Sequence, residues 1–202
     1  MRSKQLWIAI LGLGIVGVCM SNAHAHCGRC AADCKVMATS MDAGKVTLSS
    51  AADAAAAACK TTVVDIVATK AGDKVAFKAY CYGEGKMHEV TVDHSGKASA
   101  PTALKSGMGI DINTGGTVSK GMTEAKQTIA TLAATGEAAS KGKALAVTTA
   151  IKDNKVSCEV YTLAGDKLMK TAVDAAGKAG TTEEAKMLPE AKSEPMPKPK
   201  GG

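Results

Sequence analysis

Apolar and polar residues alternate along one segment near the middle of the chain. From residue 74 onward every second position is apolar, which is the period of a half-buried β-strand; these positions are Val75, Phe77, Ala79 and Cys81. A turn-favouring run follows at residues 83–86, and the alternation resumes at His88, Val90 and Val92. The pattern predicts an antiparallel hairpin in which Cys81 and His88 lie opposite each other on one face.

The same pattern occurs a second time. Residues 155–178 align with residues 74–97 at an offset of 81 without a gap, and 8 of the 24 aligned residues are identical. The second hairpin is predicted to turn at residues 164–167. In both copies the last strand ends in Asp-x-x-Gly, at Asp93 and at Asp174, which is typical of a turn. The alignment indicates a duplicated unit.

A helix and a further strand are expected before each hairpin. An alanine-rich helix is predicted at residues 49–59, where Ser50 and Asp53 have capping-box spacing. In the second copy Thr123 is the expected N-cap and Gly136 the expected end of the helix. Aligning the two helix starts needs an offset of 74, so about seven extra residues are expected at residues 135–142. Extended runs follow at residues 63–67 and 145–149.

These elements predict an α+β fold of two tandem small modules. Each module would be one helix packed on a short antiparallel sheet, in the order helix, strand, strand, strand. The expected boundaries are a cysteine-rich segment at 26–45, modules at 46–98 and 118–180, and a linker rich in glycine, serine and threonine at 99–117. Residues 181–202, rich in lysine, glutamate and proline, are expected to be disordered.

Residues 1–25 have the pattern of a secretory signal peptide. Arg2 and Lys4 precede an apolar run at residues 6–18, and Ala23-His24-Ala25 resembles a cleavage site. A retained anchor, or lipidation at Cys19, is the alternative. No later run is long and apolar enough to span a bilayer. The protein is therefore expected in the periplasm or outside the cell.

Composition narrows the choice of partners. The formal net charge is +6, and the lysines are spread along the chain without aromatic residues among them, so a nucleic-acid partner is not expected. The chain has one Phe, three Tyr and one Trp, which leaves Ala, Val, Leu, Ile and Met to form the core. No pair of catalytic groups recurs in the two copies, so the chain is not expected to be an enzyme.

The hairpin motifs resemble the PepSY-type domain. The matching residues in the second copy are Glu159-Val160-Tyr161, Gly165-Asp166-Lys167 and the run from Val173 to Lys178, and the first copy fits more loosely. This resemblance implies an exported, non-catalytic module of the cell envelope that binds or inhibits a partner protein. The first copy departs from the family pattern at Cys81, His88 and His94.

The strongest candidate for a chemical site precedes the first copy. His26, Cys27, Cys30 and Cys34 lie close together in sequence, and on one helix the three thiols would share a face. Soft ligands of this kind select Zn or Cu(I). Structural disulfides that join this segment to Cys59, Cys81 or Cys158 are the competing interpretation. A thioredoxin-like redox motif is a third one.

Cys81 and His88 form a second candidate metal site, because the predicted hairpin register places them opposite each other. A buried cysteine beside a satisfied histidine is the alternative. The preferred hypothesis is thus an exported, non-enzymatic binding or inhibitor-like protein with an unidentified envelope or extracellular protein as partner. The alternative is a periplasmic metal-binding or thiol-redox protein that uses the N-terminal cysteines.

Overall fold

The computed structural model describes residues 28–196, so the expected signal peptide, His26 and Cys27 lie outside the described residues. The first half contains α1 (Ala31–Gly44), α2 (Leu48–Cys59), β1 (Thr62–Ala71), β2 (Lys74–Gly83), β3 (Lys86–Val92), β4 (Thr102–Gly107) and β5 (Ile110–Asp111). The second contains α3 (Ile112–Glu124), α4 (Ile129–Ser140), β6 (Lys143–Lys152), β7 (Lys155–Ala164), β8 (Lys167–Asp174), β9 (Ala179–Glu184) and β10 (Ser193–Pro195).

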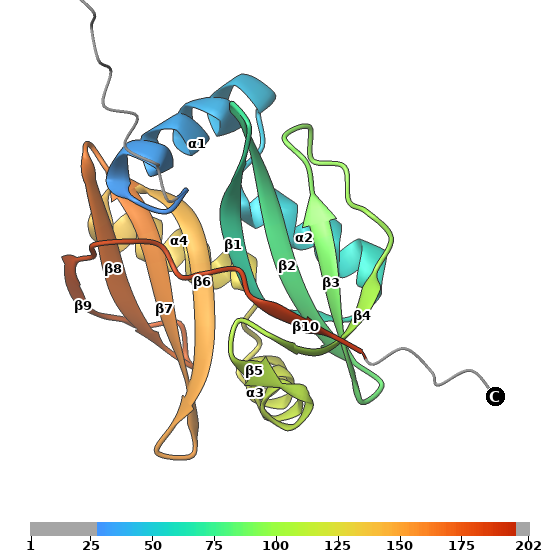
Figure 1. Ribbon diagram of the computed structural model, residues 1–202. Coiled ribbons are helices and arrows are strands. Elements are labelled where there is room, and N and C mark those ends of the chain that lie inside the picture. The colour runs from blue at the N-terminus through green and yellow to red at the C-terminus, as the bar shows by residue number, and fades with distance from the viewer. Residues whose placement is uncertain (1–27, 197–202) are drawn as a thin grey trace, which may run out of the picture.

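All of these strands belong to one antiparallel sheet (Figure 1). Their order across the sheet is β10-β4-β3-β2-β1-β6-β7-β8-β9, and β5 pairs only with β4. The α+β class is confirmed, but the prediction of two tandem modules is wrong. The hairpin of each repeat leaves one side of its first strand unpaired, and β1 and β6 satisfy each other's open edges.

The repeat extends over almost the whole described chain at a constant offset of 81. Ala31 at the start of α1 corresponds to Ile112 in α3, and Leu48 corresponds to Ile129 in α4. At the centre of the sheet Ile66 pairs with its own counterpart, Val147. A local twofold axis therefore passes between β1 and β6 and relates the two halves.

The helices cover the sheet in two ways. In Figure 1, α2 and α4 lie behind the sheet, while α1 and α3 cross its two ends. Residues 63–68 of β1 are all buried, whereas alternate residues of the outer hairpins are buried. This two-sided burial explains why residues 63–68 are apolar at every position except Asp65. Phe77 and Tyr80, two of the few aromatic side chains, are fully buried in the core.

The structure corrects the predicted helix starts. Thr47 is the N-cap of α2 and forms a capping box with Ser50, and Thr128 forms the same box with Thr131 before α4. In each box the side chain at the third helical position is a hydroxyl that bonds back to the N-cap backbone, where glutamate or glutamine is usual. Thr123 lies near the end of α3 instead of capping a helix.

Two further expectations fail with that correction. Residues 135–142 hold no insertion, because α4 ends at Ser140 as α2 ends at Cys59. Gly136 lies inside α4 and does not end it. A Cβ at Gly136 would lie 2.4 Å from Cγ1 of Val160, so a close approach of helix and strand explains this glycine.

The predicted linker and the described part of the predicted tail are structured. Residues 99–117 hold β4, β5 and the start of α3, the last of which belongs to the second repeat. Residues 181–196 hold most of β9 and all of β10, and β10 pairs with β4 across the repeat boundary. The cysteine-rich segment likewise contains α1, the first helix of repeat one. Backbone pairing with distant strands orders these polar segments in spite of their composition.

The hairpin predictions are confirmed. Glu84 and Gly85 connect β2 to β3 with positive φ at both positions, as a two-residue hairpin turn requires. Cys81 pairs with His88 in the predicted register. Asp93 Oδ1 accepts backbone N–H bonds from Ser95 and Lys97, and Asp174 Oδ1 accepts them from Ala176 and Lys178.

Candidate functional site

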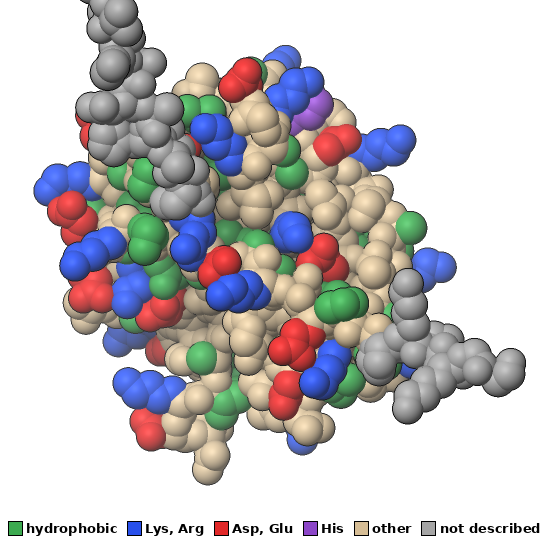
Figure 2. Space-filling model, viewed as in Figure 1, with side chains coloured by type: hydrophobic (Ala, Val, Ile, Leu, Met, Phe, Trp, Pro, Cys, Tyr) green, Lys and Arg blue, Asp and Glu red, His purple; other side chains and the backbone are tan. Residues whose placement is uncertain are grey.

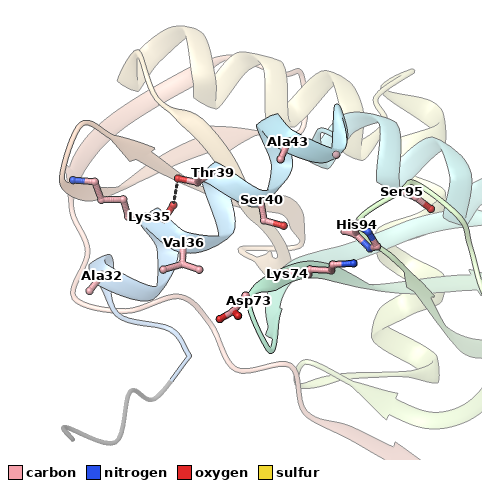
Figure 3. A pocket seen from close by; sticks show the side chains of 11 residues that line it. Ala32, Lys35, Val36, Thr39, Ser40, Ala43, Asp73, Lys74, His94 and Ser95 are labelled. Carbon is pink, nitrogen blue, oxygen red and sulfur yellow. Dashed lines mark hydrogen bonds between the residues drawn. The ribbon is translucent and has the colours of Figure 1, made fainter. Parts of the chain in front are cut away.

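A groove of about 750 Å³ lies between α1, the β1–β2 turn and the turn after β3. In Figure 3, Val36 projects from α1 on the side of Asp73 and Lys74, while His94 lies beside Lys74 and Ser95 follows it on the same turn. Ala32, Ala43 and Gly44 complete much of the helical wall. We call this cavity the first groove.

Two contacts fix α1 beside the sheet at this point. The backbone N–H of Val75 donates to Ser40 Oγ at 2.9 Å, which ties the middle of the helix to the start of β2. At the end of the helix, a Cβ on Gly44 would lie 2.1 Å from the carbonyl oxygen of His94. Only glycine allows the helix to come this close to the turn.

The turn at residues 93–97 is held rigidly. The Ser95 hydroxyl donates to Asp93 Oδ1 at 2.7 Å, and two backbone N–H groups converge on the same oxygen. Hydrogen bonds from the Ser95 hydroxyl, and then from the backbone of Lys97 and Ser95, lower the pKa of Asp93 to about 2. The carboxylate thus orders the segment that presents His94 at the groove.

The lining combines apolar, basic and hydroxyl groups. Val36 is 39% exposed, which is unusual for a valine of this fold, and it faces the groove. Lys74 supplies positive charge, His94 supplies an imidazole, and Asp73 supplies one carboxylate. Figure 2 shows a histidine beside basic side chains at the end crossed by α1, with acidic groups close by, and basic and acidic groups intermingle over the rest of this face.

The hydroxyl groups of the groove are bound to structural partners. Thr39 Oγ1 donates to the Lys35 carbonyl, Ser40 Oγ accepts from Val75, and Ser95 Oγ donates to Asp93. None of these hydroxyls is paired with His94, so this lining does not have the arrangement of an activated nucleophile. Within residues 28–196, no three His, Cys, Asp or Glu side chains lie together in a way that could hold a metal ion.

The second repeat has a counterpart, which we call the second groove, of about 990 Å³. Thr117, Gly121, Lys155 and Ala175 of its lining lie 81 residues after Val36, Ser40, Lys74 and His94. The shape is therefore repeated, but the exposed valine and the histidine are replaced by threonine and alanine. The chemistry of the first groove belongs to one repeat alone.

A buried carboxyl group lies at the junction of the two repeats. Asp65 is 1% exposed, and its Oδ1 accepts bonds from the backbone N–H of Thr149 at 2.6 Å and from its hydroxyl at 3.1 Å. Burial raises the pKa of Asp65 well above its usual value, and the two bonds from Thr149 offset this only in part. Burial, followed by the charge of Asp65, raises the pKa of Cys158 to about 12.

The N-terminal cysteines do not share one helical face. α1 begins at Ala31, Cys30 is its extended N-cap, and Gly28 has positive φ, so no continuous helix joins residues 27 and 34. Cys30 Sγ donates to Asp33 Oδ2 at 3.1 Å, while the buried Cys34 Sγ donates to the Arg29 carbonyl at 3.7 Å. Binding of Zn or Cu by this segment stays a prediction, because His26 and Cys27 lie outside the described residues.

Cys81 and His88 face each other in register, but the structure gives them different neighbours. Cys81 is fully buried and its Sγ lies 4.0 Å from the Ala55 carbonyl oxygen of α2. His88 Nδ1 is buried and, among the described residues, has no hydrogen-bond partner. In the described part of the chain, no third His, Cys, Asp or Glu side chain lies close enough to complete a metal site with them. Metal binding here also stays a prediction.

Sequence reasoning missed the first groove altogether. Its walls come from segments far apart in the chain, and α1 itself lies in the segment whose only predicted feature is its cysteines. One signal was present: the offset of 81 continues backward from Thr128 to Thr47 and relates both capping boxes. Applied to the entire chain, that offset would have revealed both additional helices.

Comparison with known proteins adds little to this geometry. No protein-family model matches the chain, and no curated protein matches it. Among solved structures, a "putative lipoprotein" from Clostridium difficile 630 is similar at 10% sequence identity, with a TM-score of 0.36 over 64% of this chain and 87% of that one. A likeness this distant assigns no function. Among residues 28–196 no helix is both long and apolar enough to cross a membrane.

Proposed function

We propose that this chain is an exported, non-enzymatic binding protein whose first groove takes an extended segment of a partner protein. The observation that carries the proposal is the groove's lining, in which an exposed valine on α1 faces a lysine and a histidine across an open channel. The second groove has the same shape without that combination, so it provides an internal comparison.

The lining defines the chemistry of the bound segment. An aliphatic side chain would cover Val36 and the neighbouring alanines of α1, removing apolar area from water. A carboxylate on the next residues would lie near Lys74, whose charge favours an acidic partner, and near the imidazole of His94, which can donate a hydrogen bond to it. The occupant is therefore a short peptide in which aliphatic and acidic residues alternate.

Two features support export and the absence of catalysis. The apolar run and small-residue site of residues 1–25 match a signal peptide, although they lie outside the described residues. The groove hydroxyls bond to backbone groups and to Asp93 instead of to a general base. The PepSY-type resemblance of the hairpins agrees with a binding or inhibitory role, but it stays a prediction because no family model matches.

Binding of defined peptides tests the proposal. The probes are a fluorescent peptide that alternates leucine with glutamate and the same peptide with lysine in place of glutamate. We expect saturable binding of the acidic peptide only. Val36→Asp and Lys74→Glu should each weaken it by about tenfold or more, which corresponds to about 1.4 kcal/mol.

The second groove supplies matched controls. Thr117→Asp and Lys155→Glu introduce the same charges at equivalent positions and should leave affinity unchanged. Equal losses in both grooves would show that binding follows net charge, and would contradict the proposal. So would the lack of saturable binding by the acidic peptide to the unmodified protein.

A further inference from the structure

The ends of α2 and α4 carry equivalent pairs of side chains that reach into the sheet. In the second repeat, the Thr162 hydroxyl of β7 donates to Ser140 Oγ, at the last position of α4, over 2.7 Å. Cys81 and Cys59 lie 81 residues earlier, on β2 and at the last position of α2. The second repeat thus has two hydroxyl groups in contact at these positions, and the first repeat has two thiols at the equivalent positions.

Both pairs lie against the equivalent helix carbonyl, but through different members. In the first repeat the strand residue, Cys81, has its Sγ 4.0 Å from the Ala55 carbonyl oxygen, and in the second the helix residue, Ser140, donates to the carbonyl of Gly136, the counterpart of Ala55. The neighbouring Cys81 thiol lowers the pKa of Cys59, and the neighbouring Cys59 thiol raises the pKa of Cys81. Both shifts agree with the adjacent positions that the repeat gives these two residues.

We infer that Cys59 and Cys81 form a disulfide bond that fastens the end of α2 to β2 in the exported protein. The two cysteines stand at positions equivalent to those of a hydroxyl pair in direct contact, so the fold brings their side chains together. The bond would close a loop of about twenty residues that contains β1, the central strand of repeat one. This inference concerns a place apart from the first groove and does not depend on peptide binding.

The exposure of the two thiols sets the order of the reaction. Cys59 is partly exposed and Cys81 is buried, so Cys59 meets the oxidant first. Its thiolate attacks one sulfur of a disulfide donor and forms a mixed disulfide with it, while the other donor sulfur leaves as a thiolate. Cys81 then loses its proton and attacks the Cys59 sulfur, releasing the second thiol. Two protein thiols are oxidised and one donor disulfide is reduced to two thiols.

Peptide mapping of the full chain after export, or after treatment with oxidised glutathione, tests this bond. Free thiols are alkylated in denaturant without reductant, and the digest is analysed by mass spectrometry. We expect one cross-linked pair of peptides that contain Cys59 and Cys81 and that separate on reduction. Full alkylation of both residues, or a bond from either one to Cys30, Cys34 or Cys158, would overturn the inference.

A variant that copies the second repeat separates a covalent role from a packing role. The double substitution Cys59→Ser with Cys81→Thr installs the hydroxyl pair that the fold already accepts at Ser140 and Thr162. Reductant should lower the melting temperature of the oxidised wild type by roughly 6 to 12 °C and leave this variant unaffected. An equal response to reductant in both proteins would contradict the assignment.

Discussion

The two repeats share a backbone at a constant offset of 81 but fill the same contacts with different side chains. Where the second repeat has Gly136 of α4 beneath Val160, the first has Ala55 and Ala79 at the equivalent positions, and both alanines are buried. A smaller residue on one element thus accompanies a larger residue on the other. The comparison shows that the two repeats keep each contact between helix and strand, while the residue at each single position differs.

Two more contacts follow this rule. Gly83 lies against Thr61 in the first repeat, where a Cβ would be 2.1 Å from Thr61 Cγ2, and the second repeat has Ala164 with Gly142. The pair of thiols at Cys59 and Cys81 becomes a pair of hydroxyls. Packing density leaves no room for an enlarged residue unless its neighbour shrinks.

The largest expected effect comes from giving one repeat the residues that the other repeat has at the contact between helix and strand. Gly136→Ala would place a Cβ 2.5 Å from the Cβ of Val160, so we expect a net loss of about 1–2 kcal/mol in unfolding free energy despite the higher helix propensity of alanine. Adding Val160→Ala should recover most of that loss. Urea denaturation of the single and double variants measures the coupling.

The reciprocal exchange in the first repeat is the control. Ala79→Val alone should be destabilising, and Ala55→Gly with Ala79→Val should be closer to wild type, because the helix can then approach the strand as α4 does. Strictly additive effects in both repeats would show that the two positions do not share a contact, and the rule would fail.

The two repeats also differ in a buried carboxyl group, which makes the stability of the fold depend on pH. The counterpart of Asp65 in the second repeat is Ala146, so only one repeat brings an ionisable group to the central pairing. Because the folded pKa of Asp65 is raised, its contribution to stability is fully present below the unfolded value of about 3.9. That contribution decreases as pH rises toward the folded pKa.

Asp65→Asn removes this titration while keeping an oxygen that can accept from Thr149. We expect the melting temperature of the variant to exceed that of wild type by several degrees at pH 8 and to be similar at pH 4, by calorimetry. Asp53→Asn, on the exposed side of α2, is the control and should leave the pH dependence unchanged. Equal destabilisation by Asp65→Asn at both pH values would mean that Asp65 is charged and favourable in the fold.

The smallest expected effect concerns the turns after β3 and β8. Both aspartates accept two backbone N–H bonds, but only Asp93 also receives a hydroxyl bond, from Ser95, since Ala176 takes that place in the second repeat. Ser95→Ala should raise the pKa of Asp93 from about 2 toward its ordinary range. Carboxyl chemical shifts in an NMR titration report this change.

His94→Ala is the control for that titration, because the charge of His94 is the last of the causes that lower the pKa of Asp93. It should move the titration far less than Ser95→Ala. Since a lowered pKa stabilises the fold above the unfolded pKa and is lost as pH falls through the folded one, the Ser95 variant should lose stability between about pH 4 and 2 less steeply than wild type. A larger effect from His94→Ala would reverse this assignment.

Local signals were sufficient for the hairpins and insufficient for the helices. Glu84 and Gly85 need only a two-residue turn with positive φ, and the alternation of β2 then sets Cys81 opposite His88. The predicted start of α4 is wrong because alanine and other strong helix formers occur on both sides of the true start, and the cap at Thr128 uses hydroxyl groups on both sides of its box. Gly136 resembles a helix end in the sequence because its reason lies on another element, at Val160.

The candidate site was less predictable for the same reason. The residues of the first groove come from α1, from the start of β2 and from the turn after β3, and only His94 and Ser95 lie within a recognised motif, the Asp-x-x-Gly turn. The thiols of Cys59 and Cys81 are visible as cysteines, but no pairing can be selected from the six that follow residue 25. Their relation depends on the fold, where the equivalent pair of Ser140 and Thr162 is in direct contact.

By itself the sequence determined the duplicated hairpin, its register, the Asp-Gly turns and the α+β class, because each of these depends on residues a few positions apart. The tertiary structure decided that β1 and β6 join the repeats into one sheet, and that β10 returns to pair with β4. Those choices depend on exposed strand edges and on close contacts between distant residues, which no short stretch of sequence encodes.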